Sequence, residues 1–128
     1  MKRLLFAFSL LTAAFTVASV NQATAQTTVT QAAFTAKINQ MDTYITAGDT
    51  ANANLTFKQL NTMMISVLGV TKQSIYSAAT PADKTYYTNY LNTQQIPIYR
   101  AIWLLKSDLV TNHAAIDEKL NQFDLLIY

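Results

Sequence analysis

Apolar side chains recur along most of this chain at steps of three and four residues, the spacing of one face of an α-helix. The first such face consists of four side chains: Phe34, Ile38, Met41 and Ile45. Gly48 favours a helix end, because glycine readily adopts the left-handed conformation that follows many helices. Asp49 can then cap the next helix by accepting a hydrogen bond from its first turn. The pattern therefore predicts one helix before Gly48 and another after Asp49.

A longer face with the same spacing follows: Phe57, Leu60, Met64, Leu68, Thr71 and Ile75. It predicts a second helix of about 30 residues, which would span roughly 45 Å. Thr80, Pro81 and Asp83 then mark a new start, because a threonine cap, a proline at the first helical position and an acid in the first turn favour a helix N-terminus. A third helix is therefore predicted to begin near Pro81.

Pro97 lies inside this third helix, although proline lacks an N–H and disfavours helical geometry at the preceding residue. The apolar spacing nevertheless continues on both sides of it: Tyr87, Leu91, Gln94, Ile98, Ala101 or Ile102, Leu105 and Leu109. A second helix of roughly 45 Å needs a partner of similar length to run back along it. We therefore predict one helix that is kinked at Pro97 and continues to about Val110.

A last apolar face follows the same spacing: Ile116, Leu120, Phe123 and Ile127. Thr111, Asn112 and His113 precede it and favour caps and turns, which indicates a break before a fourth helix. His113 also fits the apolar spacing, so one helix from Pro97 to Ile127 is the competing interpretation. The predicted fold class is all-α, a small antiparallel bundle of four helices, with three long helices plus a short one as the alternative.

The N-terminal segment differs in kind from the rest. Two basic residues precede an apolar stretch that runs to about Val20, and an A-x-A triplet ends at Ala25. This order is typical of a secretory signal peptide, so we expect residues 1–25 to be removed and residues 26–128 to form a single domain. The protein would then be periplasmic or secreted, without stable membrane insertion. Because the apolar stretch is long for a leader, an uncleaved anchor is the alternative.

Charge and cysteine content narrow the class of protein. Nine residues are Lys or Arg and seven are Asp or Glu, and two of the basic ones, Lys2 and Arg3, lie in the predicted leader. The remainder is therefore neutral, which argues against nucleic-acid binding, since that requires uncompensated cations. No cysteine occurs, so packing without disulfides must stabilise a domain of about 100 residues.

Recognised motifs for catalysis and cofactor binding are missing from the sequence. It has no glycine-rich phosphate loop, no HExxH or paired-cysteine motif and no G-x-S-x-G elbow, so we predict no catalytic residue, no metal site and no cofactor. The single histidine, His113, has Asp117 one helical turn further on, which we interpret as a structural pairing. Haem bound between Met41 or Met64 and His113, or a small apolar ligand in the bundle core, is the alternative.

Aromatic residues are the most distinctive feature of the sequence. Five of them lie in one helical region, and we call these the aromatic ridge: Tyr86, Tyr87, Tyr90, Tyr99 and Trp103. They lie on more than one helix face, so they cannot all be buried, and such side chains are enriched in binding surfaces. The aromatic ridge is therefore our candidate partner or ligand surface. The structural alternative is that it covers the core where the bundle thins to two helices.

Together these features predict a small exported, non-enzymatic helical-bundle protein with a binding or interaction role. Its expected partner is an envelope or extracellular protein. A homodimer is a further expectation, because an overhang of two helices exposes an apolar stripe that a second copy can cover.

Overall fold

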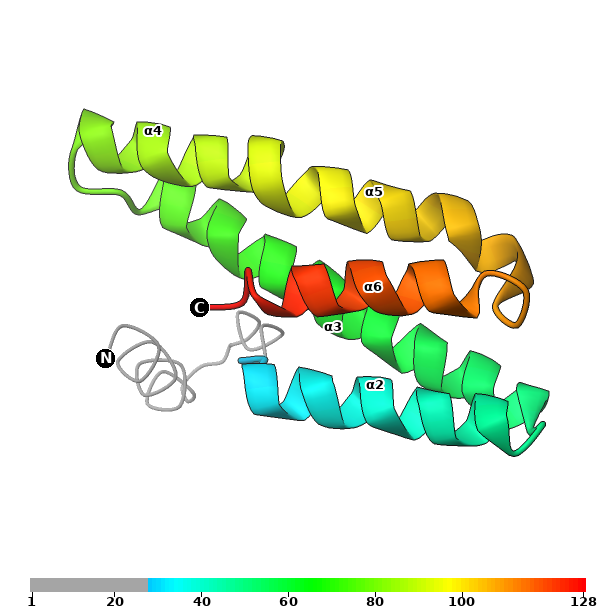
Figure 1. Cartoon of the computed structure of the whole chain (residues 1–128). Coiled ribbons are helices and arrows are strands. Elements are labelled where there is room, and N and C mark those ends of the chain that lie inside the picture. Colours follow the sequence, from blue (N-terminus) through cyan, green and yellow to red (C-terminus); the bar gives the residue numbers. More distant parts are fainter. Residues whose placement is uncertain (1–27) are drawn as a thin grey trace.

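The computed structural model describes residues 28–128, so the predicted leader, residues 1–25, lies outside the described residues. Within the described part, the chain forms an antiparallel bundle of four helices, which confirms the predicted fold class (Figure 1). The helical segments are α2 (Gln31–Thr46), α3 (Thr50–Tyr76), α4 (Pro81–Asn89), α5 (Ile96–Leu105) and α6 (His113–Asp124). No helix within residues 28–128 is both long and apolar enough to span a membrane.

The junction between α2 and α3 follows the predicted glycine and aspartate signals. Gly48 has a positive φ of 77°, a conformation that side chains with a Cβ rarely adopt. Asp49 accepts a hydrogen bond from Asn52 N through Oδ1 at 3.1 Å. Thr30 caps α2 in the same way, accepting from Ala33 N through Oγ1 at 3.1 Å. Local side chain to backbone bonds thus set the starts of both helices.

The third helix runs through Pro97 as predicted, with α4 and α5 joined by a π-helical stretch, Tyr90–Gln95. In this stretch Ile96 N–H donates to Leu91 O, five residues back. Proline at position 97 lacks an N–H and its ring crowds the carbonyl four residues earlier, so a wider turn before it relieves both problems. The departure from α-helical bonding therefore precedes Pro97 rather than coinciding with it.

The third helix ends at Leu105, so the prediction that it continues to about Val110 is wrong. A short 3₁₀ turn, Lys106–Asp108, follows it. Asp108 accepts hydrogen bonds from the Thr111 backbone N at 3.0 Å and hydroxyl at 2.7 Å, and this local turn competes with helix. The break before α6 is confirmed, and a single helix from Pro97 to Ile127 is not formed.

The core lies along the centre of the bundle and contains most of the apolar positions predicted from the sequence. Its completely buried hydrophobic side chains are Phe34, Met41, Ala53, Leu60, Met64, Ile116, Leu120 and Phe123. Phe34 and Phe123 join α2 to α6, with ring centroids 5.8 Å apart. Gln94, which the apolar spacing assigns to the inward face of the third helix, is exposed, and Gln95 is completely buried instead, because the wider π-helical turn shifts the inward positions. The Gln95 Nε2 donates to Leu126 O at 3.2 Å. That bond ties the third helix to the C-terminal segment.

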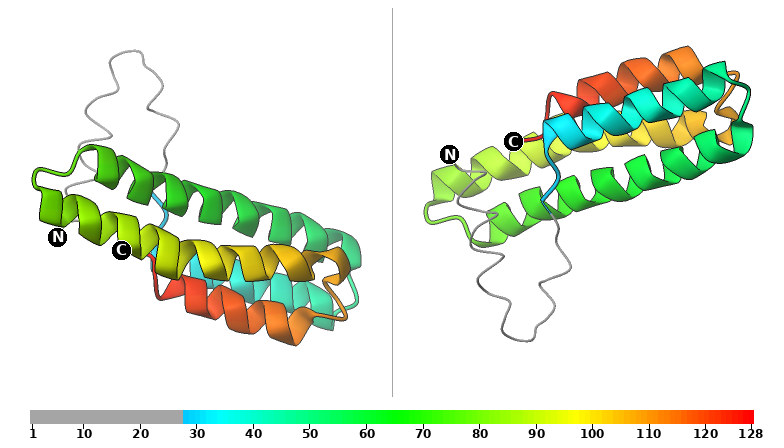
Figure 2. Two further views of the ribbon diagram at one scale, coloured as in Figure 1. Left: turned by 90° about the horizontal axis from the view of Figure 1, so that it is seen from above. Right: turned by 90° about the horizontal axis from the view of Figure 1, so that it is seen from below.

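The bundle is not equally thick along its length. Two views at right angles to Figure 1 show α3 and α4 extending together beyond the start of α2 and the end of α6 (Figure 2). The turn between Tyr76 and Pro81 lies at this two-helix end. At the opposite end, the last turns of α2 and α5 lie beside the first turns of α3 and α6 (Figure 1).

Candidate functional site

The structure divides the aromatic ridge into two groups. Tyr86, Tyr87 and Tyr90 precede or begin the π-helical stretch, whereas Tyr99 and Trp103 follow it on α5. An additional residue in a π-helical turn rotates everything after it by about 100° relative to everything before it. The two groups therefore face different surroundings.

The first group covers the two-helix end of the bundle together with the C-terminal residue, Tyr128. Tyr86 stacks on Tyr90 with centroids 6.0 Å apart, and Tyr128 contacts both Tyr87 and Tyr90. The Tyr90 hydroxyl donates to Leu126 O at 2.8 Å. Burial, with smaller effects of Tyr86 and Tyr128, raises the pKa of Tyr90. These contacts serve to fix the C-terminal segment against the third helix.

The second group lies in the half of the bundle away from that end. The Tyr99 hydroxyl donates to Asn61 Oδ1 on α3 at 2.9 Å, and its ring stacks on Trp103 with centroids 6.3 Å apart. Lys106 Nζ lies 4.2 Å from the centroid of the Trp103 ring, a cation–π contact. Trp103 nevertheless keeps 49% of its surface exposed. Its neighbours hold the indole in place while leaving it accessible.

Trp103 lies in an open groove between α3 and the end of the third helix, with a volume of about 500 Å³. We call it the α3–α5 groove. Its lining residues are Asn54, Phe57, Lys58, Asn61, Trp103 and Lys106. The lining thus combines two aromatic rings, two amides and two ammonium groups, and contains no carboxylate. A surface of this kind is complementary to a negatively charged group that adjoins an apolar one.

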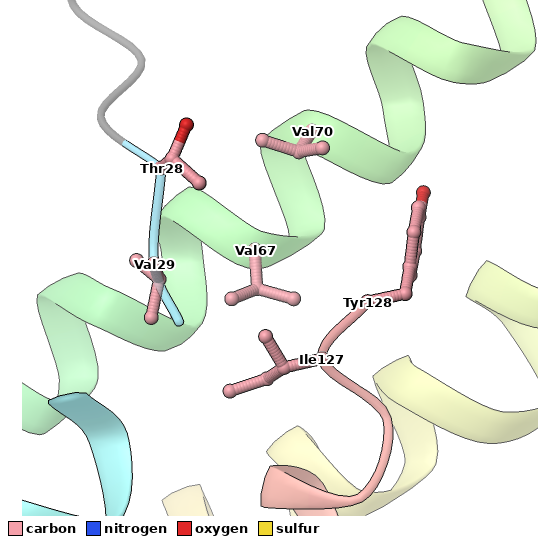
Figure 3. A pocket seen from close by; sticks show the side chains of 6 residues that line it. All are labelled: Thr28, Val29, Val67, Val70, Ile127 and Tyr128. Atoms are coloured by element: carbon pink, nitrogen blue, oxygen red, sulfur yellow. The ribbon is translucent and has the colours of Figure 1, made fainter. Parts of the chain in front are cut away.

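A second cavity, at the base of the C-terminal segment, has a volume of only about 20 Å³ (Figure 3). Figure 3 shows its mainly aliphatic lining: Thr28, Val29, Val67, Val70, Ile127 and Tyr128. This volume is close to that needed for one water molecule. It is too small for an organic ligand.

The residues named as alternative haem ligands differ in their surroundings: two lie in the core and one lies near the surface. Met41 and Met64 are completely buried in the packed core, where methionine commonly fills space. His113 is half-buried at the first turn of α6, and its Nε2 lies 2.7 Å from Asp42 Oδ1 on α2. This ring nitrogen therefore faces a carboxylate. Binding of haem or a small apolar ligand in the core stays a prediction.

Asp117 joins His113 and Asp42 in a cluster whose nearest ligand atoms all lie within 4.8 Å of one another. Desolvation, then the nearby Asp42 carboxylate, raises the pKa of Asp117 to about 6, while the charge of His113 acts in the opposite direction. Asp117 Oδ1 is buried and, among the described residues, accepts no hydrogen bond. The predicted proximity of His113 and Asp117 is confirmed, but Asp42, the residue that bonds the ring, was missed because it lies 71 positions away.

Comparisons with known proteins do not place the chain in a family. No family model matches it, and neither curated proteins nor solved structures give a match.

Proposed function

We propose that this chain is an exported, non-enzymatic helical-bundle protein that binds an acidic protein partner of the cell envelope or the extracellular space. The observation that carries the proposal is the half-exposed Trp103, which lines the α3–α5 groove together with Lys58 and Lys106. An acidic segment with an adjoining apolar side chain fits this groove in charge and in chemistry.

The composition and the rigidity of the α3–α5 groove both favour tight binding of a partner. Tryptophan and tyrosine are enriched at energetically dominant positions of protein interfaces, because each buries a large area with few rotatable bonds. Tyr99 holds the indole by stacking and is itself fixed to Asn61 on α3. Such preorganisation reduces the conformational entropy lost on binding.

The charges of the groove supply specificity for an acidic partner. Lys58 and Lys106 are exposed, and neither forms an ion pair with an acidic residue within the described part of the chain. No carboxylate of the described residues thus neutralises either ammonium group, and Lys106 Nζ lies over the Trp103 ring. The attraction of both groups for an acidic partner weakens as salt is added. A non-enzymatic role is supported by the sequence, in which no spacing identifies a nucleophile.

The chain contains one tryptophan, so fluorescence excited at wavelengths that tryptophan absorbs and tyrosine does not reports on the groove alone. We expect a synthetic peptide of alternating Glu and Leu to shift the Trp103 emission saturably, and a Lys and Leu peptide of equal length to have no effect. The double substitution Lys58→Glu with Lys106→Glu should weaken binding of the acidic peptide at least tenfold. Lys84→Glu, an exposed lysine on α4, is the matched control and should change affinity less than twofold.

Two results would contradict the proposal. One is an equal emission response to acidic and basic peptides, which would indicate non-specific adsorption. The other is an unchanged affinity for the acidic peptide after both groove lysines are exchanged, with helicity by circular dichroism retained.

A further inference from the structure

We propose that Asp42, His113 and Asp117 form a binding site for a divalent transition-metal ion of the Zn²⁺ type, between the last turns of α2 and the first turns of α6. The site is separate from the α3–α5 groove and shares no residue with it.

The ligand types suit zinc. A neutral imidazole nitrogen and carboxylate oxygens are common zinc ligands, whereas an imidazole disfavours Mg²⁺ and Ca²⁺, which prefer oxygen alone. Two carboxylates match the charge of a divalent ion, and three protein ligands leave a coordination position for a water molecule or a fourth ligand. Asp42 and His113 keep 30% and 28% of their side-chain surface exposed, so an ion can enter from solvent.

The distances require only side-chain adjustment. Ligand atoms at about 2.1 Å from a tetrahedral zinc ion lie about 3.4 Å from one another. The three nearest ligand atoms here all lie within 4.8 Å of each other, and His113 Nε2 and Asp42 Oδ1 are 2.7 Å apart. An ion placed between them would replace that hydrogen bond and draw Asp117 inward. Met41 and Ile116, which adjoin Asp42 and Asp117 in sequence, are completely buried in the core, and their packing restrains the backbone at both ligands.

A second observation points to a bound cation. Asp117 Oδ1 is buried without a hydrogen-bond donor among the described residues, an arrangement that is unfavourable for a carboxylate oxygen. Neither carboxylate forms an ion pair with a lysine or arginine of residues 28–128, and the basic side chain that faces Asp42 is His113. A divalent ion would satisfy the buried oxygen and the excess negative charge together.

The test uses the untagged chain, freed of metal with a chelator, and titrated with ZnCl₂ by calorimetry at pH 7.5. We expect one ion per chain with a Kd of micromolar order or tighter, and at least 50-fold preference over MgCl₂. His113→Ala and Asp117→Asn should each weaken binding at least tenfold. Asp124→Asn is the matched control, because Asp124 also joins α6 to α2, through Thr35 Oγ1 at 2.9 Å, and should change the affinity less than twofold.

A second measurement uses only the unmodified protein, so it tests zinc binding even if a variant fails to fold. Because the chain has one histidine, its ring signals in a ¹H–¹⁵N spectrum are unambiguous, and zinc should shift Nε2 in the unmodified protein. Absence of that shift at millimolar zinc would overturn the proposal. So would equal zinc affinity in Asp117→Asn and the unmodified chain. Neither result bears on peptide binding in the groove.

Discussion

At the scale of single residues, Asp117 stands out because its carboxyl is both partly desolvated and close to another carboxylate. Its pKa is raised to about 6, against about 3.9 for an aspartate in an unfolded chain. Between these values the folded protein binds the proton more tightly than the unfolded chain does. Its stabilising contribution is therefore complete below about pH 4 and is lost as the pH rises towards 6.

Asp117→Asn should remove this pH dependence, because an amide does not ionise. In the presence of a chelator, we expect the free energy of unfolding of the variant to rise relative to the unmodified protein by about 1 kcal/mol between pH 4 and pH 7, a value reduced for solvent screening. Urea denaturation at a series of pH values measures the difference. A constant difference across this range would show that Asp117 titrates normally.

Tyr90 and Tyr99 show that residue type alone does not determine the role of a side chain. Tyr90 and Tyr99 share a helix and a raised pKa from burial. Tyr90 donates to Leu126 O and secures the C-terminal segment, whereas Tyr99 donates to Asn61 beside the groove. The sequence placed both in one candidate surface. The partners of their hydroxyls, which lie more than 30 residues away, decide between structure and binding.

At the scale of elements, the starts and ends of helices were predictable wherever a local bond determines them. The predicted signals are all observed: Gly48 has a positive φ, and the side chains of Asp49 and Thr80 each accept a hydrogen bond from the backbone N–H three residues later. The π-helical stretch Tyr90–Gln95 was not predictable, because a proline within a helix is compatible with a kink, a break or a wider turn. Its position determines which aromatic side chains reach the groove.

Gly48 provides a direct test of the α2–α3 junction. Its φ of 77° is unfavourable for any residue with a Cβ, although no atom lies within 4 Å of a Cβ built there. Gly48→Ala should therefore destabilise the fold by about 1 kcal/mol through the backbone alone. Gly48→Asn should lower the free energy of unfolding by less than Gly48→Ala does, because asparagine tolerates this conformation better than alanine. Equal urea midpoints for the glycine and alanine proteins would contradict this assignment.

At the scale of the whole molecule, the bundle and most of its core follow from apolar spacing, but the two candidate sites do not. Lys58 and Trp103 reach one groove from different helices, and Asp42 meets His113 across 71 positions. Nothing in local spacing encodes which helices are neighbours on the surface. The single aromatic ridge reflects this limit, because it was drawn from positions along one helix. The prediction of no metal site was drawn from missing sequence motifs and stays a prediction.

We expect the partner to bind at the α3–α5 groove, which contains Trp103. The end of the bundle that Tyr86, Tyr87 and Tyr90 cover should have a structural role only. Photo-crosslinking in the native host tests both expectations, with p-benzoylphenylalanine in place of Trp103 in one variant and of Tyr86 in another. Tyr86 is 58% exposed and Trp103 49%, so exposure alone does not favour position 103. We expect a single crosslinked product from position 103, displaced by the acidic Glu and Leu peptide, and none from position 86. A product from position 86 alone, or one from position 103 that the peptide does not displace, would contradict the assignment.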